Sequence, residues 1–218
     1  MPVGHTLQPK MRVAPDSLLE TAFRMFGAQG YRATRVEEVA EAAGMTKGAI
    51  YYYFDSKEDL LRQAVEARHR TIYAEIGQAL AAQSGPVSAS IRLVLRRLWE
   101  HVVDADWGPA FRLMLGEMSV DFPALFRTWA EEGPLQWTTL VADLIEEGVD
   151  RGEFRPDTDA EVSARVVVSG LMLQAALHVH LGLDQLAPMA PDRIFDSSVD
   201  LLLHGLAVAH HRPDTPTS

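Results

Sequence analysis

The sequence predicts an all-α protein of about nine helices. Apolar residues recur at the three- and four-residue spacing of helices, and no segment alternates polar and apolar residues as a half-buried strand does. Glycine and proline separate these segments, for example at Gly30, Gly44 and Pro86, as expected where helices end. The predicted organisation is a small N-terminal three-helix unit followed by a larger helical body.

The first helix is expected over residues 16–28. Asp16 or Ser17 can cap its start, and Gly30 ends it. Leu19, Phe23 and Phe26 follow the helical spacing and form an apolar stripe. This stripe gives the next two helices a surface to pack on.

Residues 34–57 predict two short helices joined by a tight turn. Thr34 has a side chain suited to an N-cap, with Glu37 three residues later in the capping-box position. Gly44 supplies a left-handed residue at the end of the first short helix, and Thr46 is a second N-cap. Two short helices joined by a glycine-containing turn are typical of a helix-turn-helix.

The second short helix has a composition suited to reading DNA. Lys47, Gly48 and Ala49 form its first turn, where small residues let the backbone approach base edges. Ile50 and Phe54 are four residues apart and are expected to face the core. The alternative is that the run from Tyr51 to Phe54 is an aromatic core segment, but three consecutive tyrosines cannot all face inward at about 100° per residue. Lys57 follows and is placed to meet the DNA backbone.

The charge distribution separates the head from the body. Residues 1–70 hold ten Lys or Arg against nine Asp or Glu, a balance of +1, whereas the remainder holds ten against twenty-one, a balance of −11. The overall charge of −10 therefore belongs to the body. An acidic body helps to orient a near-neutral head towards DNA and keeps the protein soluble.

A long helix and then several more are expected after the head. The long helix begins at Ser56, a cap with Asp59 three residues on, and extends to about Ala82. Body helices fit at residues 87–103, 109–118, 123–150, 160–181 and 192–211, with a kink or break at Gly133-Pro134. The predicted domains are a disordered arm (1–15), a helix-turn-helix domain (16–64), a regulatory and dimerisation domain (65–212) and a disordered tail (213–218).

Two kinds of apolar surface are predicted in the body. The helices at 160–181 and 192–211 are apolar on more than one face, so more than one face must be covered. A buried central helix of a monomer and a contact with a second subunit both satisfy this pattern. A second region, from Trp99 to Trp137, is rich in aromatic and methionine side chains, which suit either ordinary core or a pocket for hydrophobic molecules.

Several other classes of function have no support in the sequence. Zero cysteines exclude a disulfide framework, and no histidine pair has metal-ligand spacing. No nucleophile or phosphate-binding motif is present, so we predict neither an enzyme nor a cofactor or metal. No apolar run of about 18 residues and no signal pattern are evident, which predicts a cytoplasmic protein without a membrane association.

Residues 16–64 closely resemble the DNA-binding domain of the TetR family of bacterial transcription regulators. The resemblance includes the run that ends at Gly44 and the run from Gly48 to Phe54, followed by Lys57. It implies base contacts by Lys47, Gly48, Ala49 and Tyr51, and phosphate contacts by Thr34, Thr46, Tyr52, Tyr53 and Lys57.

The resemblance also implies roles for the body. In this family the last two long helices form a four-helix dimer interface, which here implies Val166, Leu173, Leu177, Phe195, Val199, Leu202 and Leu206. The family's ligand cavity implies a pocket lined by Trp99, His101, Phe111, Met114, Met118, Phe122, Phe126, Trp129 and Trp137.

We therefore predict a transcriptional repressor that binds a palindromic operator in double-stranded DNA as a homodimer. A small, mainly hydrophobic effector of unknown identity is expected to release it. The alternatives are an activator or a ligand-independent regulator of the same family. A further alternative, from another class, is a protein-interaction module in which the helix-turn-helix is only a scaffold.

Overall fold

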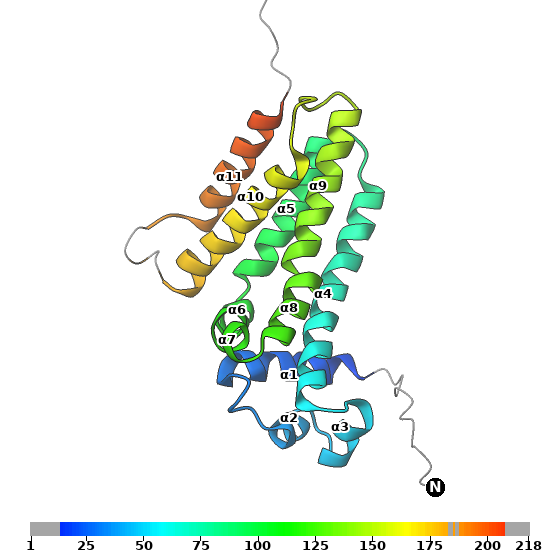
Figure 1. The fold of residues 1–218 in the computed structure, drawn as a ribbon, viewed down its shortest axis with the longest axis vertical. Helices are drawn as coiled ribbons and strands as arrows, with labels where there is room; N and C mark the ends of the chain where they lie inside the picture. Colours follow the sequence, from blue (N-terminus) through cyan, green and yellow to red (C-terminus); the bar gives the residue numbers. More distant parts are fainter. Residues whose placement is uncertain (1–13, 183–184, 186–187, 208–218) are drawn as a thin grey trace, which may run out of the picture.

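The computed structural model describes residues 14–182, 185 and 188–207, and within these ranges it holds helices and no strand. The all-α prediction is confirmed. A small head lies at one end of the molecule and a helical body at the other, with one long helix running between them (Figure 1). The head comprises α1 (Asp16–Gln29), α2 (Val36–Ala42) and α3 (Lys47–Tyr53), and the long helix is α4 (Lys57–Ala82). The body comprises α5 (Val87–Val103), α6 (Trp107–Leu113), the π-helix η1 (Met114–Met118), α7 (Ser119–Asp121), α8 (Pro123–Glu132), α9 (Pro134–Asp150), α10 (Ala160–Gln174), the π-helix η2 (Ala175–His180) and α11 (Pro191–Leu206).

The head folds around the apolar stripe of α1. Leu19, Phe23 and Phe26 are buried there, and Ile50 and Phe54 bring α3 onto the same core. Gly30 and Gly44 have φ values of +88° and +68°, the left-handed region that favours glycine. Both glycines end their helices as predicted.

The predicted caps are correct at two helices and wrong at two. The Thr46 hydroxyl accepts a hydrogen bond from the Ala49 amide at 3.3 Å, and the Ser56 hydroxyl accepts one from the Asp59 amide at 3.1 Å. Helix α1 is preceded by Pro15 and has no side-chain cap, although Asp16 or Ser17 was expected to provide it. Helix α2 is preceded by Arg35, again without a side-chain cap, so Thr34 does not cap it.

The head shares its hydrophobic core with the lower part of the body. Trp107, Leu113 and Met114, from α6 and η1, pack in the same cluster as the buried residues of α1 to α3. The upper body has its own core, in which α5, α9, α10 and α11 pack on one another. Residues of α6, η1 and α8 therefore belong to the same packed cluster as the head. The division at residues 64 and 65 stays a prediction.

Most body helices follow the predicted segments, but the last one, expected over residues 192–211, ends at Leu206 with Ala207 as its C-cap. The expected break lies at Gly133, where α8 ends and α9 begins with Pro134. Helix α10 continues through η2 to His180, close to the predicted end at residue 181. The predicted disordered tail, and all but Ala14 and Pro15 of the predicted arm, lie outside the described residues, and Ala14 is buried.

One sequence prediction about membranes needs correction. The continuous helix Ala160–His180 has 21 residues and a mean hydropathy of 1.5, enough by length and composition alone to cross a bilayer. This helix packs on α9, α11 and α5. Of the apolar stretch, 33% is buried within the chain, and one helix of this kind is weak evidence of a membrane span.

Candidate nucleic-acid interface and effector pocket

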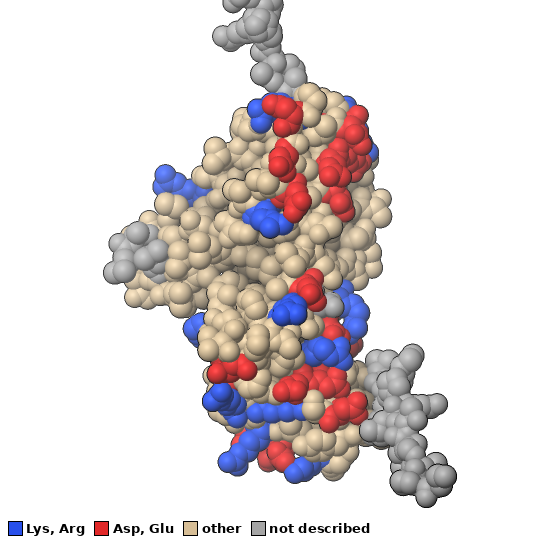
Figure 2. Space-filling model, viewed as in Figure 1, with Lys and Arg blue, Asp and Glu red and all other residues tan. Residues whose placement is uncertain are grey.

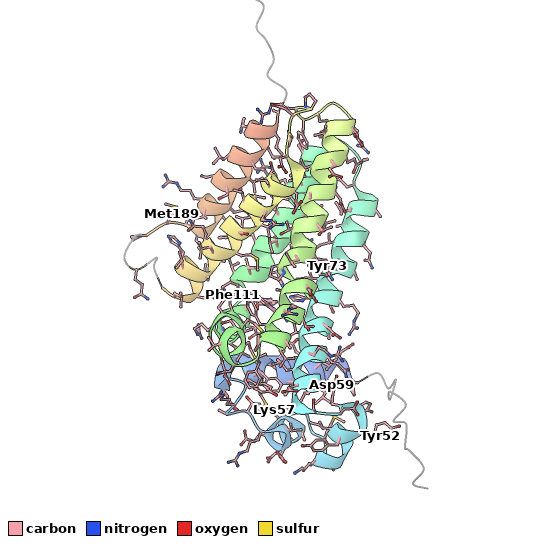
Figure 3. The ribbon with its side chains drawn as sticks, in the orientation of Figure 1. Tyr52, Lys57, Asp59, Tyr73, Phe111 and Met189 are labelled. Carbon is pink, nitrogen blue, oxygen red and sulfur yellow. The ribbon has the colours of Figure 1, made fainter. Side chains whose placement is uncertain are left out.

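Helix α3 presents its first turn and two tyrosines at the outer surface of the head. Ile50 and Phe54 are each 1% exposed and anchor the helix from below. Tyr51 and Tyr52 are 43% and 46% exposed on the other faces, and Tyr52 lies at the outer edge of the head (Figure 3). The prediction that at least one tyrosine must face outward is confirmed.

Lys47 joins α3 to α2 through an ion pair with Glu37. The hydrogen bond from Lys47 lowers the pKa of Glu37, and the same bond raises the pKa of Lys47. Both side chains are about half exposed, so solvent screens this pair and it contributes little to stability. The ammonium also lies 6.0 Å from the centre of the Tyr51 ring. Lys47 is thus held at the outer surface beside a second predicted base contact.

The Lys57 side chain is more buried than its predicted contact with a DNA phosphate requires. Its ammonium donates a hydrogen bond to the Arg32 carbonyl at 3.3 Å and sits 4.5 Å from the centre of the Tyr31 ring. Partial burial lowers the pKa of Lys57. Lys57 therefore connects the start of α4 to the loop between α1 and α2, and Figure 3 labels it at the end of α4 that lies near α2. A phosphate contact by this residue stays a prediction.

Thr34 is placed differently from the prediction. Only 1% of it is exposed, and its hydroxyl donates to the Gly30 carbonyl at 2.7 Å and approaches the Met25 carbonyl at 3.3 Å. The hydroxyl satisfies carbonyls at the end of α1 and does not face solvent. Thr34 is therefore a structural residue of the α1–α2 loop here.

Sequence reasoning missed Glu117, which attaches the body to the head. Its carboxylate accepts hydrogen bonds from the backbone amides of Tyr31 at 3.0 Å and Arg32 at 2.8 Å. Arg32 also pairs with Asp121 at 3.1 Å, and the Tyr31 ring packs edge-on against Phe122 at 4.5 Å between centroids. Because Glu117 is 86 residues from Tyr31 in sequence, no local pattern could have identified it.

The predicted pocket residues do not line one cavity. Trp99 belongs to the upper core beside Phe195, whereas Met114, Met118 and Trp129 belong to the core shared with the head. Phe111, Phe122 and Phe126 are partly buried at the edge of that lower core. His101 and Trp137 line a small gap of about 10 Å³ between the two cores, and Trp129 lines the same gap. The region is packed, so an effector must displace side chains to enter.

A larger opening lies on the other side of α4. A cleft of about 560 Å³ separates α1, α4 and α5, and His101 reaches it as well. Arg68 crosses the cleft to Glu20 and Asp104, each at 3.4 Å. The lining residues carry five carboxylates against this single arginine. Figure 2 shows charges of both signs mixed over the head and acidic residues prominent on the visible face of the upper body.

The predicted dimer residues fall into two groups. Phe195, Val199 and Leu206 are buried within the chain itself, so the structure leaves little of these three side chains for a partner to contact. Val166 and Leu173 are 69% and 56% exposed, and Leu177 and Leu202 are half-buried. Val162 and Leu201, which the prediction omitted, are 54% and 78% exposed.

No group of three or more His, Asp or Glu side chains among the described residues is placed to hold a metal ion.

The head and the body together define a helix-turn-helix transcription regulator. A model for bacterial regulatory proteins of the tetR family matches residues 18–64. A second model, the C-terminal domain of AefR-like transcriptional repressors, matches residues 89–205, more than half of the chain. The chain belongs to the TetR family of DNA-binding transcription regulators.

Known relatives agree with this assignment. The HTH-type transcriptional repressor KstR2 of Mycolicibacterium smegmatis is 29% identical over 159 residues, covering 70% of this chain and 73% of the relative. KstR2 of Rhodococcus jostii is 25% identical over 194 residues, covering 89% and 91%. The fatty acid degradation regulator FadR from Bacillus halodurans has the same fold, with a TM-score of 0.73 at 19% identity over 92% of this chain and all of that chain.

Proposed function

We propose that this protein is a repressor that binds a palindromic operator as a homodimer and releases it when a small, mainly hydrophobic effector enters the body. The observation that carries the proposal is the exposed face of α3, anchored by Ile50 and Phe54 on a head that shares its core with the body. Because the head shares this core, helix α3 changes position when the side chains of the body repack. The match of the body to AefR-like repressors and the repressor relatives favour repression over activation.

The proposed DNA contacts divide into two kinds. Lys47, Gly48, Ala49 and Tyr51 approach base edges, and Thr46, Tyr52, Tyr53 and Lys57 contact phosphates. Loss of a phosphate contact weakens all sequences together and reduces the salt dependence, whereas loss of a base contact changes the preference among sequences. Thr34 is left out because its hydroxyl is buried.

Gel shifts with the DNA upstream of the protein's own coding region test this division. Tyr52→Ala should weaken binding to specific and unrelated DNA alike, and Lys47→Ala should reduce the discrimination between them. Arg151→Ala removes a similarly exposed positive charge at the far end of α9 and should change neither (Figure 1). If wild-type protein binds no palindromic fragment at low salt, the DNA-reading proposal fails. Derepression of a reporter in cells that lack the protein separates a repressor from an activator.

The proposed dimer surface is the uncovered apolar face of α10 and α11. Val162, Val166 and Leu173 follow the helical spacing along α10, and Leu201 is exposed on α11, which packs against α10. Apolar patches of this kind on a soluble protein mark interaction sites. A two-fold dimer also matches an operator whose half-sites lie about 34 to 36 Å apart.

Light scattering at micromolar concentration tests the dimer. Wild-type protein should have twice the mass of the 24.1 kDa chain. Val166→Glu and Leu201→Glu each place a charge on the proposed interface and should give the monomer mass. Val120→Glu is the matched control, because Val120 is 77% exposed on α7, away from this face. A dimer that persists in both interface variants would refute this surface.

The proposed effector acts by shifting populations. A ligand that binds a body conformation with a different α4 position disfavours the conformation that fits the operator, and DNA then weakens ligand binding equally. Typical coupling is about 1 to 3 kcal/mol, or roughly 5- to 150-fold in affinity. A ligand-independent regulator would show the same operator affinity with every bound compound.

A further inference from the structure

Three residues that line the small gap between the two cores each have a buried ring nitrogen without a hydrogen-bond partner. These nitrogens are Nδ1 of His69 on α4, Nε2 of His101 on α5 and Nε1 of Trp129 on α8. All three residues line the gap of about 10 Å³. Buried polar groups are nearly always paired, and an unpaired one costs about 1 to 3 kcal/mol. Three such groups at one place need an explanation beyond packing.

Two of these nitrogens, Nε2 of His101 and Nε1 of Trp129, can only donate a hydrogen bond. The indole nitrogen of Trp107 donates to Nδ1 of His101 at 3.1 Å, so that imidazole atom is an acceptor. Burial lowers the pKa of His101 to about 2, which keeps the ring neutral. In a neutral imidazole with an accepting Nδ1, the proton is on Nε2. Trp129 can only donate.

The remainder of the gap is apolar and uncharged. Trp107, Trp137, Met172 and Val102 contribute to its wall, and none of its lining residues carries a charged side chain. The gap has about the room of a single water-sized atom. His69 stacks on Trp107 with 5.6 Å between ring centroids, which holds α4 to the same wall.

We propose that this gap is the polar anchor of the effector site. A neutral carbonyl or ether oxygen of an otherwise apolar molecule enters the gap and accepts hydrogen bonds from the N–H groups of His101 and Trp129. The apolar part of the molecule displaces the aromatic side chains around the gap. A carboxylate is disfavoured because a buried anion needs a positive partner, and burial lowers the pKa of His69 to about 4 and so opposes its protonation.

The anchor also connects the ligand to DNA binding, a step that rests on the proposed function. His69 lies on α4, which continues from the head, whereas His101 and Trp129 lie on body helices. A ligand oxygen bound by His101 and Trp129 joins α5 to α8, and His69 of α4 lines the same gap, so the apolar part of the ligand packs against α4. The effector then selects one arrangement of head and body.

Two matched probes test the anchor by calorimetric titration. In 2-methyl-1-octene a methylene group replaces the carbonyl oxygen of 2-octanone. The wild-type ratio of the alkene Kd to the ketone Kd measures the preference for oxygen. One lost hydrogen bond corresponds to roughly 2- to 12-fold. We expect Trp129→Phe to lower the ratio by this factor. Trp137→Phe removes an indole of the same size from the same wall and should leave the ratio unchanged.

A second measurement uses wild-type protein and does not depend on how the variants fold. With ¹⁵N-labelled tryptophan, 2-octanone should move the indole N–H signal of Trp129 downfield, and 2-methyl-1-octene should not. Equal ratios in wild type and Trp129→Phe, tighter binding of octanoate than of 2-octanone, or no saturable ketone binding would each overturn the proposal. Wild-type binding to the operator is scored separately in the gel shift, so a failure there counts against the proposed function and not against the anchor.

Discussion

Removing the carboxylate of Glu117 should loosen the head and destabilise the protein. In Glu117→Ala, the backbone amides of Tyr31 and Arg32 lose their acceptors at 3.0 and 2.8 Å. Hydrogen bonds to a charged group contribute about 1.5 to 3 kcal/mol each. The Arg32 bond is exposed, so we take the lower end of that range for both bonds and expect a loss of about 3 kcal/mol. The ion pair with Arg32 adds little, because that arginine is 69% exposed.

Differential scanning calorimetry measures this loss. For a domain of this size, 1 kcal/mol shifts Tm by about 2 to 4 °C, so Glu117→Ala should lower Tm by about 6 to 12 °C. Glu117→Gln keeps one acceptor oxygen and should lose roughly half as much. Glu100→Ala is the matched control, since Glu100 is an exposed helical glutamate paired with Arg97 at 3.0 Å and should change Tm by about 2 °C or less.

The same variant should also weaken operator binding at a temperature where it is fully folded. Glu117 holds the loop that leads into α2, and α2 carries the partner of Lys47 on α3. We expect about a five-fold loss or more, the low end of typical coupling between sites. A Tm within 2 °C of wild type together with unchanged operator affinity would refute the role of Glu117.

Two further predictions concern the junction between head and body. His69 and His101 have pKa values lowered by burial to about 4 and about 2, so stability is complete above pH 6.5 and falls below it. Urea unfolding should show a loss of roughly 2 to 3 kcal/mol between pH 7.5 and 5.5, and a flat profile would contradict neutral buried imidazoles. Gly133→Ala places a methyl group 2.7 Å from Cε1 of His69 and should cost about 1 to 3 kcal/mol in thermal unfolding. Gly77→Ala, with open space around Gly77 within α4, should stabilise by about 0.5 to 1 kcal/mol, and equal effects of both substitutions would refute the steric explanation.

Local chemistry explains why most helix boundaries could be predicted. The range of α5, residues 87–103, agrees with the prediction because Pro86 precedes it and its apolar spacing is regular. Gly44 and Thr46 likewise define the turn before α3, since a left-handed glycine and a capping hydroxyl act within a few residues. Ile50 and Phe54 could be assigned to the core because they lie on one face of a short helix.

Local patterns could not decide which apolar face meets which neighbour. Helix α11 is apolar on several sides, so periodicity did not separate Phe195, which is buried within the chain, from Leu201, which is 78% exposed. For the same reason the residues from Trp99 to Trp137 could be chosen as soft and aromatic, but not divided between two cores.

The sequence by itself determined an all-α chain with a helix-turn-helix, the start and end of most helices, and the outward position of at least one tyrosine of α3. Those features depend on residues within one or two turns of each other. Only the tertiary structure decided that the Thr34 hydroxyl is buried, that Glu117 holds the α1–α2 loop and that His101 and Trp129 share one gap. These contacts join residues far apart in the chain, and their partners are set by how whole helices pack.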